Sequence, residues 1–175
     1  MYRDEKIYFY IIYFSSIFSV DNSYSQNSSE IPKVWHKKGE TLTSFFGVSL
    51  YNGTLFAPVD KPFNIDGNYA LSLSYLRSFK AKTLIKSTIK EIDRIQGMTI
   101  EEQKNLSNLL FDCFVNVSKG DRITAIAIHK NEISFFYNGK KQCDLEMANI
   151  RRKFFSIWLG NNTRDFEGSL RLQGL

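Results

Sequence analysis

Alternation of hydrophobic and polar residues marks several short strands in this chain. The clearest case is ALSLSY at residues 70–75, which places Leu71, Leu73 and Tyr75 on one face. Residues 45–56 also alternate and predict two strands, with turns at Gly47 and at Asn52-Gly53. Further strands are predicted at residues 122–129, 133–137, 140–145 and 169–172.

Helical spacing of apolar residues replaces this alternation in three segments. Residues 81–95 carry apolar side chains at intervals of three and four, and Gly97 ends the predicted helix. Thr99 and Glu102 form a predicted capping box for a second helix, which runs to Phe114. Residues 148–159 predict a third helix. We therefore expect an α+β fold in which helices cover one side of an antiparallel sheet.

The chain of 175 residues fits one domain, and its first 25 residues have the features of a signal peptide. Ile7–Val20 is an apolar run that follows Arg3 and Lys6, and Ser23 and Ser25 are the small residues of a cleavage site. We expect a signal peptide at 1–25, a polar leader at 26–33 and a folded domain at 34–175. The mature protein is then periplasmic or secreted. The alternative is an uncleaved segment that anchors the protein, and it is the only membrane contact expected.

The net charge of +5 is spread along the chain and gathers in no basic arm or nucleic-acid motif, so we expect no nucleic-acid partner. Cys113 and Cys143 are the only cysteines. In an exported protein they are able to form a disulfide, but we favour a free, buried thiol at Cys113. No CxxC pair, metal-binding motif or catalytic motif is present, and His36 and His129 lie far apart, so no metal or cofactor is predicted.

Four blocks carry a resemblance to a known family. They are FGVSLYNGTLF from Phe46, LSLSYLRSF from Leu71, KGDRITAIAI from Lys119 and FFSIWLGNNTRDFEGSLRLQG from Phe154. In order and spacing they resemble the bacterial branch of the chalcone isomerase-like family. The resemblance implies an open-faced β-sandwich, a large antiparallel sheet covered on one side by helices, with the ligand between the layers. Plant members cyclise a flavonoid precursor, and related members bind fatty acids through an arginine and a tyrosine.

The catalytic residues of the plant enzymes do not recur in this chain. Where those enzymes carry Gly-x-Arg-Gly, residues 39–42 read GETL, and no arginine lies between Arg3 and Arg77. The catalytic threonine of the family falls near Tyr51. The tyrosine and asparagine of the next helix fall within residues 80–87, which contain neither. The resemblance therefore implies no assignable catalytic residue.

Five residues within the shared blocks are candidate ligand-binding residues: Tyr51, Tyr75, Arg77, Asp121 and Trp158. The tyrosine and tryptophan rings are equally typical of core packing, and Gly120-Asp121 is typical of a turn. For Arg77, an ion pair with Asp121 is favoured over a ligand carboxylate.

The leading hypothesis is an exported, non-catalytic protein that holds a small apolar ligand, such as a fatty acid, between sheet and helices. Arg77 and Tyr51 or Tyr75 would lie at the polar end of the ligand. One alternative is an isomerase, an intramolecular lyase acting on an unsaturated carbonyl, with Tyr51 or Tyr75 as acid and Lys80 as electrostatic partner. The other is an envelope scaffold whose own side chains fill the cleft.

Overall fold

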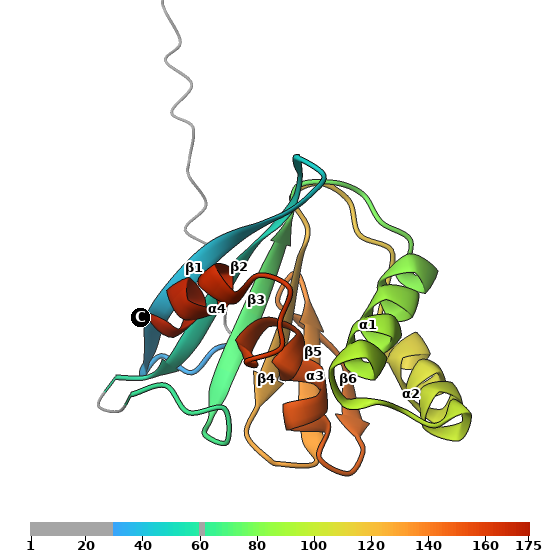
Figure 1. Ribbon diagram of the computed structural model, residues 1–175. Helices are drawn as coiled ribbons and strands as arrows, with labels where there is room; N and C mark the ends of the chain where they lie inside the picture. The colour runs from blue at the N-terminus through green and yellow to red at the C-terminus, as the bar shows by residue number, and fades with distance from the viewer. Residues whose placement is uncertain (1–29, 60–61) are drawn as a thin grey trace, which may run out of the picture.

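The computed structural model describes residues 30–59 and 62–175, and its centre is one antiparallel sheet (Figure 1). The six strands follow one another across the sheet in chain order. They are β1 (Trp35–Phe45), β2 (Val48–Pro58), β3 (Tyr69–Tyr75), β4 (Arg122–Ala127), β5 (Glu132–Tyr137) and β6 (Lys140–Glu146). The predicted antiparallel meander is therefore confirmed, while the predicted signal peptide lies outside the described residues.

Side-chain alternation along β3 separates the two faces of the sheet. Leu71, Leu73 and Tyr75 all pack into the main core under the helices, as the sequence pattern predicts. Ala70 and Ser72 face the other way, where Ala70 joins a smaller cluster and the Ser72 hydroxyl lies 3.0 Å from that of Thr124. One face is therefore the core, and we call it the inner face.

The first two helices begin and end as the sequence predicts. α1 (Ala81–Gln96) ends at Gly97, whose φ of 69° lies in the left-handed region that glycine tolerates. α2 (Ile100–Cys113) has a complete capping box, because Thr99 Oγ1 accepts from the Glu102 N–H and the Glu102 carboxylate accepts from the Thr99 N–H. α1 packs against both α2 and α3 (Ile150–Leu159).

The last predicted strand, residues 169–172, is wrong, because α4 (Phe166–Gln173) is a helix. Its start is capped by Asp165, whose carboxylate accepts from the Gly168 N–H at 2.7 Å, and Gly174 ends it at a φ of 77°. The helix lies on β1 and buries Ser169 and Leu172, which are three residues apart. It comes so close that a Cβ at Gly39 would overlap the Arg171 carbonyl oxygen.

The predicted turn at Asn52-Gly53 is also wrong, because both residues lie within β2. Asn52 pairs with Leu42 and with Ser74, in register with the strands on either side. The predicted turn at Gly47 is confirmed, because β1 and β2 are joined at Phe46-Gly47, with φ values of 48° and 75°. β1 begins at Trp35, well before the predicted strand. It is a largely exposed edge strand, and its polar run KKGET has no alternation of hydrophobic and polar residues that would predict it.

Cys113 and Cys143 form a disulfide that joins the end of α2 to β6. The preference for a free thiol at Cys113 was therefore wrong. No local pattern links the two cysteines, since 30 residues separate them and only the tertiary fold brings their Cα atoms to 5.2 Å.

Residues 30–35 cross the face of the sheet opposite the helices. Ile31 packs with Ala70 and Ile126, and the fully buried Glu30 carboxylate pairs with Arg122 at 3.1 Å. Thr124 also donates to Glu30 at 3.2 Å. In the part of the chain that the structure describes, no helix has the length and apolar character needed to cross a membrane.

Candidate functional site

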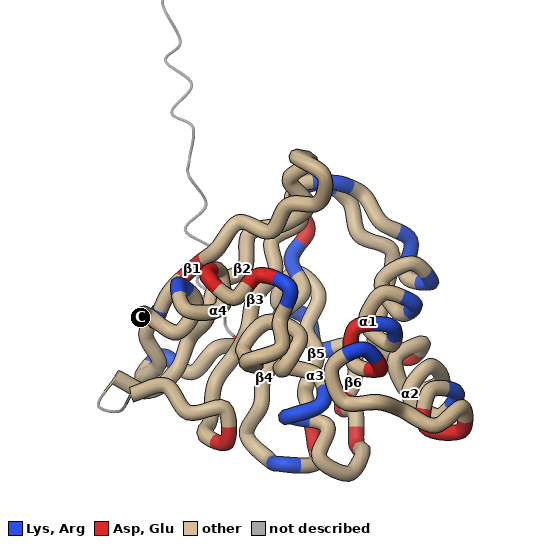
Figure 2. Tube along the Cα trace, in the orientation of Figure 1, with Lys and Arg blue, Asp and Glu red and all other residues tan. Residues whose placement is uncertain are grey.

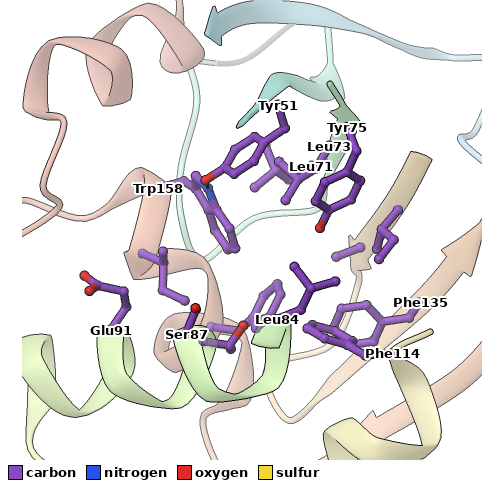
Figure 3. A pocket seen from close by; sticks show the side chains of 15 residues that line it. Tyr51, Leu71, Leu73, Tyr75, Leu84, Ser87, Glu91, Phe114, Phe135 and Trp158 are labelled. Atoms are coloured by element: carbon purple, nitrogen blue, oxygen red, sulfur yellow. Dashed lines mark hydrogen bonds between the residues drawn. The ribbon is translucent and has the colours of Figure 1, made fainter. Parts of the chain in front are cut away.

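A cavity of about 140 Å³ lies between the inner face of the sheet and helices α1 and α3 (Figure 3). Strands β2 to β5 form one wall, α1 and α3 the other, and Phe114 closes the side next to α2. Most of its surface is apolar, and the apolar side chains of the lining include Leu71, Leu73, Ile123, Phe135, Phe154 and Phe114. The cleft between sheet and helices is therefore only partly filled by the side chains of the protein.

Tyr51 and Trp158 form a polar pair at one edge of this cavity. The Trp158 Nε1–H donates to the Tyr51 hydroxyl at 2.9 Å, and Tyr51 is also hydrogen-bonded to the Thr43 side chain. Burial raises the pKa of the Tyr51 hydroxyl, so it stays protonated at neutral pH. The pair joins β2 to α3 and holds both rings against the cavity.

Tyr75 is a buried residue whose hydroxyl faces the cavity. Its ring packs edge-to-face on Tyr51 and on Phe79, with centroids 5.9 Å apart in both contacts. The hydroxyl points into the cavity (Figure 3), and no described residue forms a hydrogen bond with it. Burial raises its pKa well above the ordinary value, so at neutral pH the group is an O–H donor that points into an apolar space.

Helix α1 adds the remaining polar groups, Ser87, Thr88 and Glu91. The Glu91 carboxylate lies at the rim and pairs with Arg94 and with Arg164, each at 2.8 Å. Partial burial raises the pKa of this carboxyl, but the hydrogen bonds and charges of Arg164 and Arg94 outweigh it and leave the pKa below its ordinary value. Glu91 is therefore ionised and tied to two arginines, neither of which lines the cavity.

The structure brings together three of the five predicted site residues, Tyr51, Tyr75 and Trp158, and leaves two outside. Arg77 is exposed, and no ion pair joins it to Asp121 or to another described residue. Asp121 accepts instead from the Ser118 N–H, the Tyr137 hydroxyl and the Asn138 amide, at 2.7 to 2.9 Å. The favoured Arg77–Asp121 ion pair is thus wrong, and Asp121 organises a turn.

Sequence reasoning missed Ser87 and Glu91 and treated Thr88 as an ordinary core position. With Leu84 these residues follow the spacing of one helix face, so polar residues within an apolar stripe were the available signal. Lys80, the proposed electrostatic partner for catalysis, precedes α1 as an exposed residue and does not line the cavity. Among residues 30–59 and 62–175, no three His, Cys, Asp or Glu side chains gather as a metal site.

Comparison with known proteins places this architecture in a family. The family model described as chalcone isomerase-like matches residues 37–173. The chain belongs to the chalcone isomerase-like family. Among solved structures, the fatty-acid binding protein of Arabidopsis thaliana is similar in fold, with a TM-score of 0.63 and 12% sequence identity over 82% of this chain and 89% of that chain. A search of curated protein sequences finds no significant match.

Proposed function

We propose that this chalcone isomerase-like protein binds a small apolar molecule in the cavity under α1 and α3 and does not transform it. One observation carries the proposal: the hydroxyl of Tyr75 faces a largely apolar cavity and has no partner among the described residues. A donor that faces an apolar space without a partner is unfavourable, and a ligand oxygen would satisfy it. An apolar pocket with few polar groups is the usual form of a small-molecule site.

The size of the cavity limits the ligand. An engineered apolar cavity of about 150 Å³ accommodates benzene, and pockets for drug-sized ligands begin at about 300 Å³. The cavity of about 140 Å³ therefore fits a compact molecule or one end of a longer chain. The exposed Ser87 in its lining provides a side from which a longer ligand would extend to solvent.

The charges around the cavity favour a neutral polar group on the ligand. No lysine or arginine belongs to the described lining, and the charged residue there is the ionised Glu91. A ketone or ester oxygen would accept from Tyr75 without burying a charge, whereas a carboxylate would be buried without a cation. The fatty-acid binding named for the Arabidopsis protein supports an apolar ligand. A fatty acid would place its acyl chain inside and its carboxylate towards solvent.

Titration of a fatty acid and its methyl ester of equal chain length tests this proposal. We expect the ester to bind at least as tightly as the acid. The Ala125→Leu variant, which fills the cavity from β4, should lose binding, and Tyr75→Phe should lower the affinity for the ester about tenfold. Native mass spectrometry of the purified protein then searches for a retained ligand. Undiminished binding by the Ala125→Leu variant would place the ligand elsewhere and refute the proposal.

Export is a further part of the proposal, and the disulfide supports it. Disulfides persist in oxidising compartments such as the bacterial periplasm and are rare where thiols are kept reduced. The Cys113–Cys143 bond is therefore consistent with cleavage of a signal peptide near Ser25. The intact mass of the protein isolated from cells tests this directly. A chain that still begins at Met1 would favour the membrane-anchored alternative.

A further inference from the structure

Two phenylalanines at the tip of the β1–β2 hairpin are exposed. The exposed fraction is 61% for Phe45 and 91% for Phe46, and Val48 beside them is also exposed. The two rings contact each other edge-to-face with centroids 4.4 Å apart. We call Phe45, Phe46 and Val48 the hairpin tip.

The turn itself does not require these aromatic rings. Phe46 has a φ of 48°, a left-handed conformation that asparagine or glycine adopts more readily than a bulky residue. The tip also extends beyond the sheet, because the last backbone hydrogen bond from the described hairpin residues to the next strand's end joins the Leu76 N–H to the Leu50 carbonyl at 2.9 Å. At about 3.3 Å per residue, Phe46 lies on the order of 10 Å beyond that contact.

A collar of basic residues lies beside the hairpin tip. The connections at residues 76–80 and 114–121 run next to each other, since Phe79 and Val117 form a bridge and the Gly120 N–H donates to the Tyr75 carbonyl. Figure 2 shows blue segments along this end of the molecule. The collar consists of Arg77, Lys80, Lys82 and Lys119, all exposed and without an ion-pair partner among the described residues. The acidic residue in these connections, Asp121, already accepts three hydrogen bonds and forms no ion pair with the described residues of the collar.

We propose that the hairpin tip inserts into the interface of an anionic lipid membrane, with the basic collar contacting the headgroups. Aromatic rings that project past a ring of lysine and arginine match the two attractions that hold peripheral proteins on such membranes. A second copy of this chain fits less well, because the two collars would repel each other. Three side chains also offer far less area than the roughly 800 Å² per partner of a stable interface.

The hairpin tip and the basic collar lie close to the candidate cavity, so membrane docking would bring the cavity near the lipid. Tyr75 is the last residue of β3 and lines the cavity, and the collar begins two residues later at Arg77. A protein seated by this end would hold its cavity near the lipid phase, where apolar molecules concentrate. Membrane docking does not depend on that use, because it rests on the hairpin tip and collar alone.

A fluorescent probe at the tip tests the insertion in the full chain. Because both native cysteines are in the disulfide, Phe46→Cys supplies a single thiol for an environment-sensitive dye. The matched control is Phe111→Cys, which replaces a phenylalanine of α2 that is 73% exposed. A probe confined to position 46 reports the hairpin even if the N-terminal segment holds the chain on the vesicle.

With vesicles of phosphatidylcholine and phosphatidylglycerol, we expect the dye at position 46 to brighten and to be quenched by nitroxide-labelled lipid. The dye at position 111 should not respond. Equal responses at both positions, or no response at position 46, would overturn the proposal. So would a response at position 46 that rises with protein concentration in the absence of vesicles, since it would identify a second copy as the occupant.

Charge reversal tests the collar separately. On the Phe46→Cys background, Lys80→Glu with Lys119→Glu should weaken the vesicle response at least about tenfold. The control pair, Lys104→Glu with Lys130→Glu, makes the same change in net charge at exposed positions outside the collar and should weaken it less. Equal weakening by both pairs would show attraction by net charge alone and would overturn the role of the collar.

Discussion

The two ends of β3 each carry a tyrosine on the inner face, Tyr69 and Tyr75, but the surroundings of the two hydroxyls differ. Tyr69 is fully buried between Phe63 and Phe155, with ring centroids 5.3 and 4.8 Å away, and its hydroxyl donates to the Ile65 carbonyl at 3.1 Å. Tyr75 is almost as buried, yet its hydroxyl points into a cavity and has no described partner. Tyr69 is therefore part of a closely packed core, whereas Tyr75 lines a cavity.

The difference lies in what covers each end. At the Tyr69 end, α3 supplies a large ring, and Arg151 holds the neighbouring loop by donating to the Gly67 carbonyl at 3.1 Å. At the Tyr75 end, α1 presents the short side chains of Ser87 and Thr88, which leave space under the helix. Burial alone therefore does not distinguish the two tyrosines, whereas the hydroxyl of Tyr75, which points into a cavity, is the basis of its proposed role.

Loss of the disulfide should have the largest effect on stability, because the bond lies beside the cavity that Tyr75 lines. Cys113 precedes Phe114, and Cys143 pairs across strands with Phe135, so the bond joins two walls of the cavity. Replacing both cysteines with alanine should lower the free energy of unfolding by ~2–4 kcal/mol and weaken ligand binding. Urea unfolding with and without reductant measures the first effect. Loss of stability with unchanged affinity would show that packing alone keeps the cavity walls in place.

Two alanines on β4 test the same comparison by adding volume. Ala125 lines the cavity, whereas Ala127 is fully buried opposite Tyr69. Ala127→Leu should lower the free energy of unfolding by about 1–3 kcal/mol, because a packed core has no room for the added carbons. Ala125→Leu should change it by less than ~1 kcal/mol, since the cavity accepts them. Equal losses in urea unfolding would mean that the space under α1 is not a real cavity.

Removal of the Tyr69 or the Tyr75 hydroxyl should change stability least, and the two variants compare the two ends of β3 most directly. Tyr69→Phe loses a buried hydrogen bond and should lower the free energy of unfolding by about 1 kcal/mol. Tyr75→Phe loses no hydrogen bond within the described protein and should change stability by less than about 0.5 kcal/mol. Thermal unfolding of the two variants without ligand gives the comparison. A larger loss for Tyr75→Phe would reveal a structural role for its hydroxyl.

Much of the fold follows from local patterns that the sequence displays. The alternation around Leu71 and the capping box at Thr99 each depend on a few neighbouring residues, and both are confirmed. The segment at 169–172 alternates too, but Asp165 and Gly174 cap a helix there, and the close approach at Gly39 gives it a place to pack. Capping signals outweighed a short alternation in that case.

The candidate site was less accessible to sequence reasoning, because it depends on distant pairs. Tyr51 and Trp158 were singled out as rings, but only the fold shows that they meet across 107 positions of sequence. The sequence pattern did not predict the ion pair between Glu91 and Arg164. It also did not predict that Asp121 accepts hydrogen bonds from Tyr137 and Asn138. The family resemblance placed the ligand between the layers, and the cavity lies there.

The position of α4 on β1 also has a consequence for synthesis. The first strand is translated early, but the helix that covers it, Phe166–Gln173, is translated after all the other strands and helices of the sheet and its cover. On a ribosome that adds about 5–20 residues per second, the first hairpin waits on the order of ten seconds for that cover. The domain thus closes only after residues 166–173 are made, and a chain cut short before residue 166 would expose the inner face of β1 to aggregation or proteolysis.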